Sequence, residues 1–226
     1  MKYDNIVRGV FLERPNRFIA RVETANGEEI VHVKNTGCCR ELLIPGAEVF
    51  LTAPGNPLRK TRFDLVAVRK SSGLLVNIDS QAPNRVAGEW LETRGYDSVA
   101  PEFRYGESRL DFCMRRGEEM WLMEVKGCTL EVEGVGWFPD APTQRGAKHL
   151  MTLAQAAEAG LHAQLAFVIQ MDGVREVRPN EATDPAFAQA LATAGAAGVE
   201  VLFLSTHVMP GGMEVVDCRR MERRQS

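Results

Sequence analysis

The sequence predicts a mixed α/β protein in which a small β-barrel precedes a larger domain with a central mixed sheet flanked by helices. Before Ser80, short apolar or alternating runs are separated by turn residues, which is typical of closely spaced strands. After Ser80, helical spacing alternates with strand-like runs, as in a sheet covered by helices. The chain of 226 residues is long enough for both parts, so we predict domains over 1–80 and 81–226.

The first domain is predicted to be all β. Turn signals such as Pro15-Asn16, Asn26-Gly27 and Pro45-Gly46 separate its apolar runs. One helical turn is expected over 40–43. Short strands in this number favour a closed barrel such as an OB-fold, with a β-sandwich as the alternative. The predicted strands are 5–12, 17–23, 28–33, 48–52, 62–68 and 73–78.

The second domain is predicted to read helix, three strands, helix, strand, helix, strand. Thr143 and Asp184 are the expected N-caps of its later helices, because each precedes a run with helical apolar spacing. The connection after Lys126 is rich in Gly and Pro and is expected to be extended. The predicted helices are 85–93, 144–159 and 185–196, and the predicted strands are 98–105, the two arms of a hairpin over 108–126, 163–169 and 199–204.

Composition and cysteine content exclude several classes of protein. Charged residues make up 25% and hydrophobic residues 45% of the chain, which is ordinary for a globular protein. Charges interrupt every apolar run before it reaches membrane-spanning length, and the beginning of the chain has no apolar signal segment. Five cysteines without a CxxC pair argue against a disulfide framework or structural zinc. We therefore expect a cytoplasmic protein with no membrane partner.

Charge is distributed unevenly along the chain. Residues 1–70 hold 12 Lys and Arg against 8 Asp and Glu, a net charge of +4. The remainder holds 15 against 22, a net charge of −7. Basic and polar residues of the first domain could neutralise or hydrogen-bond phosphates, although such clusters are more often solvated loops. The candidate nucleic-acid contacts are Lys34, Asn35, Arg40, Arg59, Lys60 and Arg62, with Thr36 and Gly37 as further donors.

The hairpin 108–126 carries the candidate catalytic residues. Its arms alternate apolar and polar residues around Arg116-Gly117, and alternate side chains of a strand point to opposite faces. Leu110, Phe112 and Met114 form the apolar set of the first arm and leave Asp111 opposite. On the second arm Trp121, Met123 and Val125 share one face, and Leu122, Glu124 and Lys126 share the other. Asp111, Glu124 and Lys126 would then lie side by side, as chance also produces on a solvated face.

Two carboxylates beside a lysine suit phosphodiester hydrolysis. Carboxylate-bound Mg²⁺ (or Mn²⁺) makes water nucleophilic at neutral pH, and the lysine orients that water or stabilises negative charge. We expect Asp111 and Glu124 as metal ligands, and Glu89 on the preceding helix as a third acid, although a lone helix glutamate is more often a surface residue. His149 either faces this site or lies on the helix surface. No P-loop, GxGxxG or Ser-His-Asp order is present.

Several segments together resemble the sugar fermentation stimulation protein family, SfsA. They are VKNTG, ELLIPGAEV, RKTRFDLVAVR, VNIDSQAPN, YGESRLDF, EVKG, FPDAPTQRGAKHL and FVIQ, and they follow one another through nearly the whole chain. The resemblance implies an N-terminal OB-like domain and a PD-(D/E)xK nuclease-like domain. It places the nuclease motif on Asp111, Glu124 and Lys126, with Glu89 as the helix acid. It also places Asp140, Thr143 and Arg145 near the site without a role. Lys148, on the helix that follows, is a further residue expected beside the site.

Two functions are consistent with these observations. The first is a metal-dependent nuclease acting on single- or double-stranded DNA, with the barrel holding the strand. The second is a DNA-binding regulator of sugar (maltose) metabolism, as the resemblance implies, whose nuclease-like domain does not turn over. The complete Asp111, Glu124 and Lys126 set favours metal chemistry. A basic surface on one side would permit a homodimer that encloses DNA. Paired carboxylates also serve glycosidases, but the lysine fits phosphate better.

Overall fold

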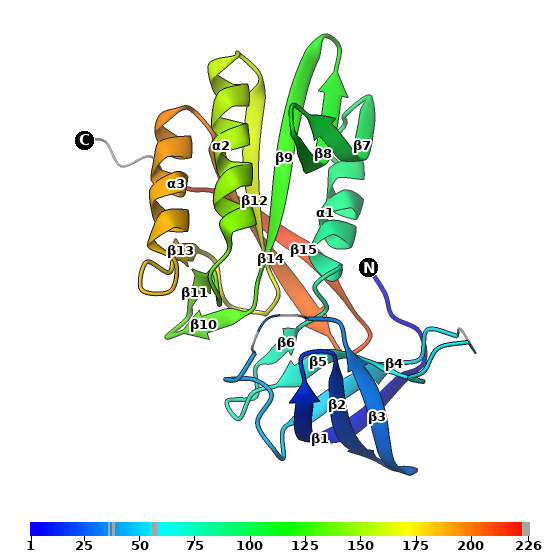
Figure 1. Ribbon diagram of the computed structural model, residues 1–226. Helices are drawn as coiled ribbons and strands as arrows, with labels where there is room; N and C mark the ends of the chain where they lie inside the picture. Colours follow the sequence, from blue (N-terminus) through cyan, green and yellow to red (C-terminus); the bar gives the residue numbers. More distant parts are fainter. Residues whose placement is uncertain (36, 38, 56–57, 223–226) are drawn as a thin grey trace.

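The structure is a computed structural model that describes residues 1–35, 37, 39–55 and 58–222 (Figure 1). Expectations that concern Thr36, Cys38, the Asn56-Pro57 turn and the last four residues lie outside this description. Figure 1 shows two parts, a barrel below and a larger sheet with helices packed against it above. No helix in the described part of the chain combines the length and apolar character needed to cross a membrane.

The first part is a closed barrel, as predicted. β3 pairs with β2, then β1, β4, β5 and β6 follow in the sheet, and β3 also pairs in parallel with β5 through His32 and Asp64. This closure excludes the sandwich alternative. The expected helical turn is a hydrogen-bonded turn in which the amides of Leu42 and Leu43 both donate to the Cys39 carbonyl. The strands are β1 Ile6–Asn16, β2 Ile19–Thr24, β3 Gly27–Val33, β4 Glu48–Thr52, β5 Asp64–Arg69 and β6 Leu75–Asn77.

The second part has a six-stranded mixed sheet of order β15-β14-β12-β9-β8-β7, in which β9, β12 and β14 are parallel neighbours. β10, β11 and β13 form a small separate sheet that the sequence analysis did not predict, and β15 was also missed. The elements are α1 Ala82–Glu92, β7 Ser98–Tyr105, β8 Ser108–Arg116, β9 Glu119–Cys128, β10 Leu130–Val132, β11 Val135–Phe138, α2 Gln144–Glu158, β12 His162–Ile169, β13 Val177–Pro179, α3 Pro185–Ala196, β14 Glu200–Met209 and β15 Gly212–Arg220.

The two predicted helix caps are confirmed. The Thr143 side chain accepts a hydrogen bond from the Gly146 amide at the start of α2. Asp184 accepts one from the Phe187 amide at the start of α3, and its other oxygen accepts one from the Thr143 amide. Because the first amides of a helix have no partner within it, these side chains fix both helix starts and tie them together.

Helices cover both faces of the large sheet. α1 packs on the face that carries Met123 and Val125, and α2 and α3 pack on the face that carries Leu122 (Figure 1). The two faces of β9 are therefore as predicted. On β8 the prediction was wrong, because Leu110 joins the cluster under α2 whereas Phe112 joins the cluster under α1. The pairing of β8 with β9 ends at Phe112 opposite Met123, so the alternation breaks at Asp111.

A buried polar network joins the barrel to the large sheet. Asp79 has no exposed surface and accepts hydrogen bonds from the Lys34 ammonium at 2.8 Å and the Tyr3 hydroxyl at 3.1 Å. The Gln170 amide nitrogen donates to the Asn77 carbonyl, the Asn77 side chain and the Asp79 carbonyl. Satisfied buried polar groups are rigid, so this network fixes the barrel relative to β12 and the start of α1.

Candidate active site at the end of the hairpin

The structure brings Asp111, Glu124 and Lys126 together where β8 departs from β9. Asp111 Oδ2 accepts a hydrogen bond from the Val125 amide at 2.8 Å, so the carboxylate leans across β9 between Glu124 and Lys126. The Lys126 ammonium lies 2.5 Å from Glu124 Oε1. The break in strand pairing thus frees a β9 amide to hold Asp111, which regular pairing would have used within the sheet.

Glu124 is buried and held by one of its two oxygens. Only 2% of its surface is exposed. Oε1 accepts hydrogen bonds from Lys126 and from His149 Nδ1 on α2. Oε2 is buried and has no hydrogen-bond partner among the residues that the structure describes. A buried carboxylate oxygen without a partner is unfavourable, so this atom marks a place where a ligand would be stabilised.

The two carboxyl groups have opposite pKa shifts. Burial raises the pKa of Asp111, and the neighbouring charge of Glu124 raises it further. Burial also acts to raise the pKa of Glu124, but His149 and Lys126 outweigh it and leave that pKa below its ordinary value. Neighbouring carboxylates disfavour each other's ionisation, and a cation bound between them would favour the ionised form of both.

Two further residues support the pair, and the sequence analysis did not assign them that role. Asn84 on α1 donates to Asp111 Oδ1 at 2.7 Å. His149, whose orientation was left open, faces Glu124. Arg145 Nε donates to His149 Nε2 at 3.4 Å, so the ring proton is on Nδ1 and points at Glu124. Asn84 is the last residue of the segment VNIDSQAPN and lies one helical turn before Gly88. A Cβ on Gly88 would contact the Phe112 ring, so this side of α1 faces the hairpin.

Other predicted residues lie elsewhere. Glu89 Oε2 lies 2.6 Å from the Met1 ammonium, so this carboxylate is not among the groups gathered at Asp111. Lys148 is exposed on α2, and Thr143 serves as the α2 cap. Among the residues the structure describes, no group of three or more His, Cys, Asp or Glu side chains is arranged to hold a metal ion.

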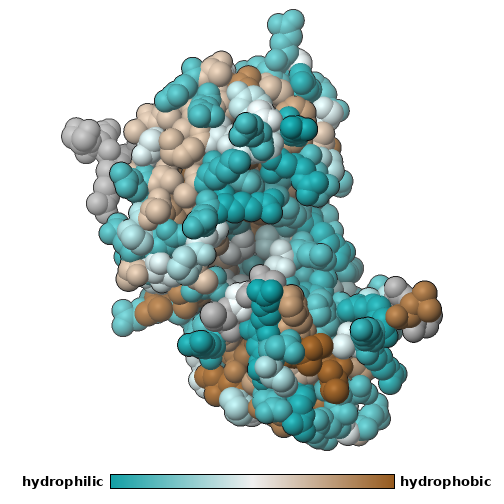
Figure 2. Space-filling model, viewed as in Figure 1, coloured by the Kyte–Doolittle hydropathy of each residue, from teal (hydrophilic) through white to brown (hydrophobic). Residues whose placement is uncertain are grey.

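The candidate phosphate contacts of the barrel separate into two groups. Lys34 is paired with Asp79, Asn35 donates to the Ile78 carbonyl, and both Arg59 nitrogens pair with Asp64, so these three side chains have structural partners. Arg40, Lys60 and Arg62 are exposed, and the Arg62 guanidinium lies over the Phe63 ring. Figure 2 shows hydrophilic residues over the surface between the two parts, above the more hydrophobic patches of the barrel.

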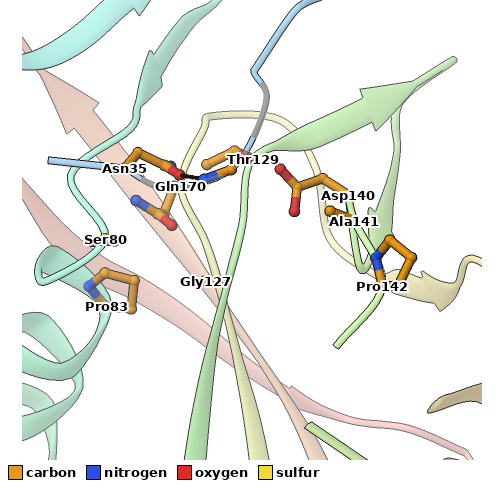
Figure 3. Close-up of a pocket in the computed structure, with 10 residues that line it drawn as sticks. Asn35, Ser80, Pro83, Gly127, Thr129, Asp140, Ala141, Pro142 and Gln170 are labelled. Atoms are coloured by element: carbon orange, nitrogen blue, oxygen red, sulfur yellow. Dashed lines mark hydrogen bonds between the residues drawn. The ribbon is translucent and has the colours of Figure 1, made fainter. Parts of the chain in front are cut away.

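A pocket of about 360 Å³ lies at the junction, next to the strand that carries Glu124 and Lys126 (Figure 3). Gly127 and Gln170 line it from the large sheet, Asn35 and Gly37 from the barrel, and Asp140 from the loop before α2. Asp140 is exposed as a residue, but burial of its carboxyl group raises its pKa and outweighs the hydrogen bonds from the Asp140 and Ala141 amides, which act to lower it. The family resemblance implied that Asp140 lies near the site, and in the structure Asp140 lines this pocket.

Fold and site define a two-domain protein in which an OB-type barrel is fixed to an α/β domain with a carboxylate pair and a lysine on adjacent strands. Residues 12–78 match the family described as "SfsA N-terminal OB domain", and residues 81–212 match "Sugar fermentation stimulation protein RE domain". The chain therefore belongs to the sugar fermentation stimulation protein family, SfsA.

Relatives match the chain over nearly its full length. A sugar fermentation stimulation protein homolog of Desulfitobacterium hafniense (strain Y51) is 50% identical over 221 residues, 96% of each chain. The homolog of Ruminiclostridium cellulolyticum is 48% identical over 219 residues, 95% of this chain and 96% of that one. A solved structure described as Pyrococcus furiosus SfsA in complex with Ca²⁺ superimposes with a TM-score of 0.84 at 29% identity and covers 95% of both chains.

Proposed function

We propose that this protein binds DNA without strong sequence preference and hydrolyses its phosphodiester bonds with the help of a divalent cation, Mg²⁺ or Mn²⁺. The observation that carries the proposal is the Glu124 carboxylate. One oxygen is fixed by Lys126 and His149, and the other is buried and has no partner among the described residues. The charge of Glu124 also acts on Asp111 and raises its pKa. A hard cation is the ligand that such an oxygen pair favours.

The donor set suits a cation that also binds substrate. Asp111 and Glu124 would hold it, and their number is right for Mg²⁺, which uses one or two carboxylates and keeps water and phosphate oxygens as its other ligands. The Pyrococcus furiosus relative, described in complex with Ca²⁺, supports a site for a hard divalent ion in this fold. When bound, the cation supplies Lewis-acid stabilisation of phosphate charge and a water of lowered pKa.

The remaining residues position these groups. Asn84 and the Val125 amide hold both oxygens of Asp111, and His149, oriented by Arg145, holds Glu124 Oε1. Such supporting hydrogen bonds fix ligand orientation. Lys126 places a positive charge on the same strand face, where it stabilises negative charge developing on a phosphate. Arg40, Lys60 and Arg62 provide an exposed basic surface on the barrel that suits the DNA backbone.

The test is incubation of the purified protein with single- and double-stranded DNA in Mg²⁺, Mn²⁺ or EDTA. We expect cleavage that requires metal and is lost in Asp111→Asn and Lys126→Ala. Glu118→Gln and Arg115→Ala are matched controls, because they remove the same charges from exposed positions of the same hairpin, and they should cleave normally. Metal-independent cleavage, or equal loss in the controls, would contradict the assignment.

The second candidate is a DNA-binding regulator of sugar (maltose) metabolism genes that does not cut DNA. One observation favours it, since the described residues contain only a pair of carboxylates here and no larger metal-binding cluster. In the same experiment this candidate predicts salt-dependent DNA binding without cleavage in any metal. It also predicts that the Asp111→Asn variant binds DNA as tightly as the unmodified protein.

A further inference from the structure

The pocket at the junction is lined by a buried hydrogen-bond acceptor that no residue in the described part of the chain uses. Gln170 is 2% exposed, and its amide nitrogen donates to two backbone carbonyls and to the Asn77 side chain. Because carbonyl oxygens only accept, the orientation of this amide is determined, and Oε1 must point the other way. Oε1 accepts no hydrogen bond from any described residue, and Gln170 lines the pocket.

A carboxylate adds a second acceptor group. Asp140 lines the same pocket and forms no ion pair within the part of the chain that the structure describes. The pocket has no Lys, Arg or His among its described lining residues. Thr129 adds a hydroxyl group that can donate or accept, and the rings of Pro83 and Pro142 add apolar wall (Figure 3). An anion is disfavoured here, and an uncharged group rich in N–H donors is favoured.

Two glycines make room for these acceptors. A Cβ on Gly127 would lie 2.2 Å from Gln170 Oε1, and a Cβ on Gly37 would lie 2.6 Å from Asp140 Oδ2. Both distances are far below van der Waals contact, so any side chain at either position would displace an acceptor from its place. Gly37 comes from the barrel and Gly127 follows Lys126 on β9, so both parts of the protein shape the pocket.

The geometry points to this pocket as a binding site for a nucleobase that carries an exocyclic amino group, placed beside the phosphate that the Asp111 and Glu124 site would act on. The inference rests on the proposed function, because it names the substrate group held next to that site. Amino and imino groups of a base edge donate to carboxylate and amide oxygens, and a well-placed bidentate pair of such bonds favours the matching base over the others. Guanine presents both N1–H and an amino group on one edge, and thymine has no amino group.

Size and position agree with this occupant. A volume of about 360 Å³ lies at the low end of small-molecule pockets, which span roughly 300–1,000 Å³, and suits a nucleoside rather than a larger ligand. Gly127 directly follows Lys126, and Pro83 directly precedes Asn84, which holds Asp111. A base from a single-stranded or unpaired segment would enter this pocket while its phosphate lies over β9.

The experiment measures binding of free deoxynucleosides to the full-length protein by saturation-transfer NMR in EDTA. Nucleosides carry no phosphate and need no metal, so the result does not depend on cleavage. We expect deoxyguanosine to bind at least fivefold more tightly than thymidine, with deoxyadenosine and deoxycytidine between them. Asp140→Asn should reduce the ratio to below twofold. Gly37→Ala should do the same while leaving the Asp140 charge in place.

Glu181→Gln is the matched control, since it removes an exposed carboxylate outside the pocket, and it should keep the preference. Equal binding of all four nucleosides, no binding of any, or an unchanged ratio in both pocket variants would overturn the inference. Failure of the proposed function would give a different result, namely no metal-dependent cleavage and no salt-dependent DNA binding. These two properties are measured in separate assays.

Discussion

Substitution of Lys34 distinguishes two roles for this basic residue of the barrel, namely contact with DNA and attachment of the barrel to the large sheet. Its ammonium lies 2.8 Å from Asp79, whose side chain has no exposed surface, while the Lys34 side chain is 18% exposed. Lys34→Met keeps the apolar length of the side chain and leaves the buried carboxylate without its cation. The Tyr3 hydroxyl and the Gln81 amide still donate to Asp79. The loss in the free energy of unfolding is therefore expected near the lower end of the range of roughly 3–5 kcal/mol typical of breaking a buried ion pair.

That range gives a loss of about 3 kcal/mol in the free energy of unfolding. For a chain of this size it corresponds to a fall of about 6–12 °C in Tm. Lys60→Met, which changes an exposed lysine of the same barrel, should stay within about 0.5 kcal/mol. The assay is urea unfolding at pH 7, followed by circular dichroism and tryptophan fluorescence in parallel.

A double variant sharpens the test. In Lys34→Met with Asp79→Asn no buried charge is left unpaired, so stability should recover by more than 1 kcal/mol over Lys34→Met alone. DNA affinity should keep its salt dependence in Lys34→Met and lose part of it in Lys60→Met. If Lys34→Met unfolds like the unmodified protein and instead flattens the salt dependence, then Lys34 contacts phosphate and the assigned role of the Asp79 pair is wrong.

Three further predictions concern the barrel, a cap and the site strand. Lys60→Ala and Arg62→Ala should each weaken DNA binding equally for all sequences and reduce the slope of log K against log salt by about 1, measured by fluorescence anisotropy; salt-independent affinity would contradict this. Asp184→Ala should lower the free energy of unfolding by about 1 kcal/mol. Hydrogen bonds from the Thr143 and Phe187 amides lower the pKa of Asp184, so its stabilisation is present above the unfolded pKa of about 4 and disappears as pH falls through the lower folded value. Urea midpoints of variant and parent should therefore converge in acid, and a constant gap would count against the cap. Gly127→Ala should destabilise by about 1–3 kcal/mol through its clash with Gln170, whereas Gly195→Ala, inside α3 with open space around it, should stabilise by about 0.5–1 kcal/mol in the same unfolding assay.

The sequence predicted what local periodicity controls. Glu124 and Lys126 share a face because β9 stays in regular parallel pairing with β12 on this stretch. Thr143 and Asp184 cap helices because capping depends on the next three residues. β15 was missed for a related reason. It lies at the edge of the sheet and most of its side chains are exposed, so its sequence lacks the apolar alternation that marks a strand.

Contacts between segments that are distant in the sequence could not be predicted from local sequence patterns. The alternation on β8 predicted Leu110 and Phe112 on one face, but the strand leaves β9 at Asp111 and the two residues pack on opposite sides. Nothing near Lys34 in the chain shows that its partner is Asp79, 45 residues away. Asn84 and His149 reach the site from two helices on opposite faces of the sheet, and only the folded arrangement gives them their roles.

The same long-range contacts explain why the candidate site depends on both parts of the protein. Asn77 and Asp79, at the end of the barrel, accept the hydrogen bonds that orient Gln170. Gln170 Oε1 in turn lies against Gly127, one residue beyond Lys126. A loosened Lys34–Asp79 pair would therefore disturb the base preference of the pocket as well as stability. The loss of an exposed lysine such as Lys60 would change only affinity for the backbone. Parallel measurement of nucleoside preference in Lys34→Met and Lys60→Met separates these roles. Only Lys34→Met changes the residues that orient Gln170, so only this variant should lose the preference for deoxyguanosine.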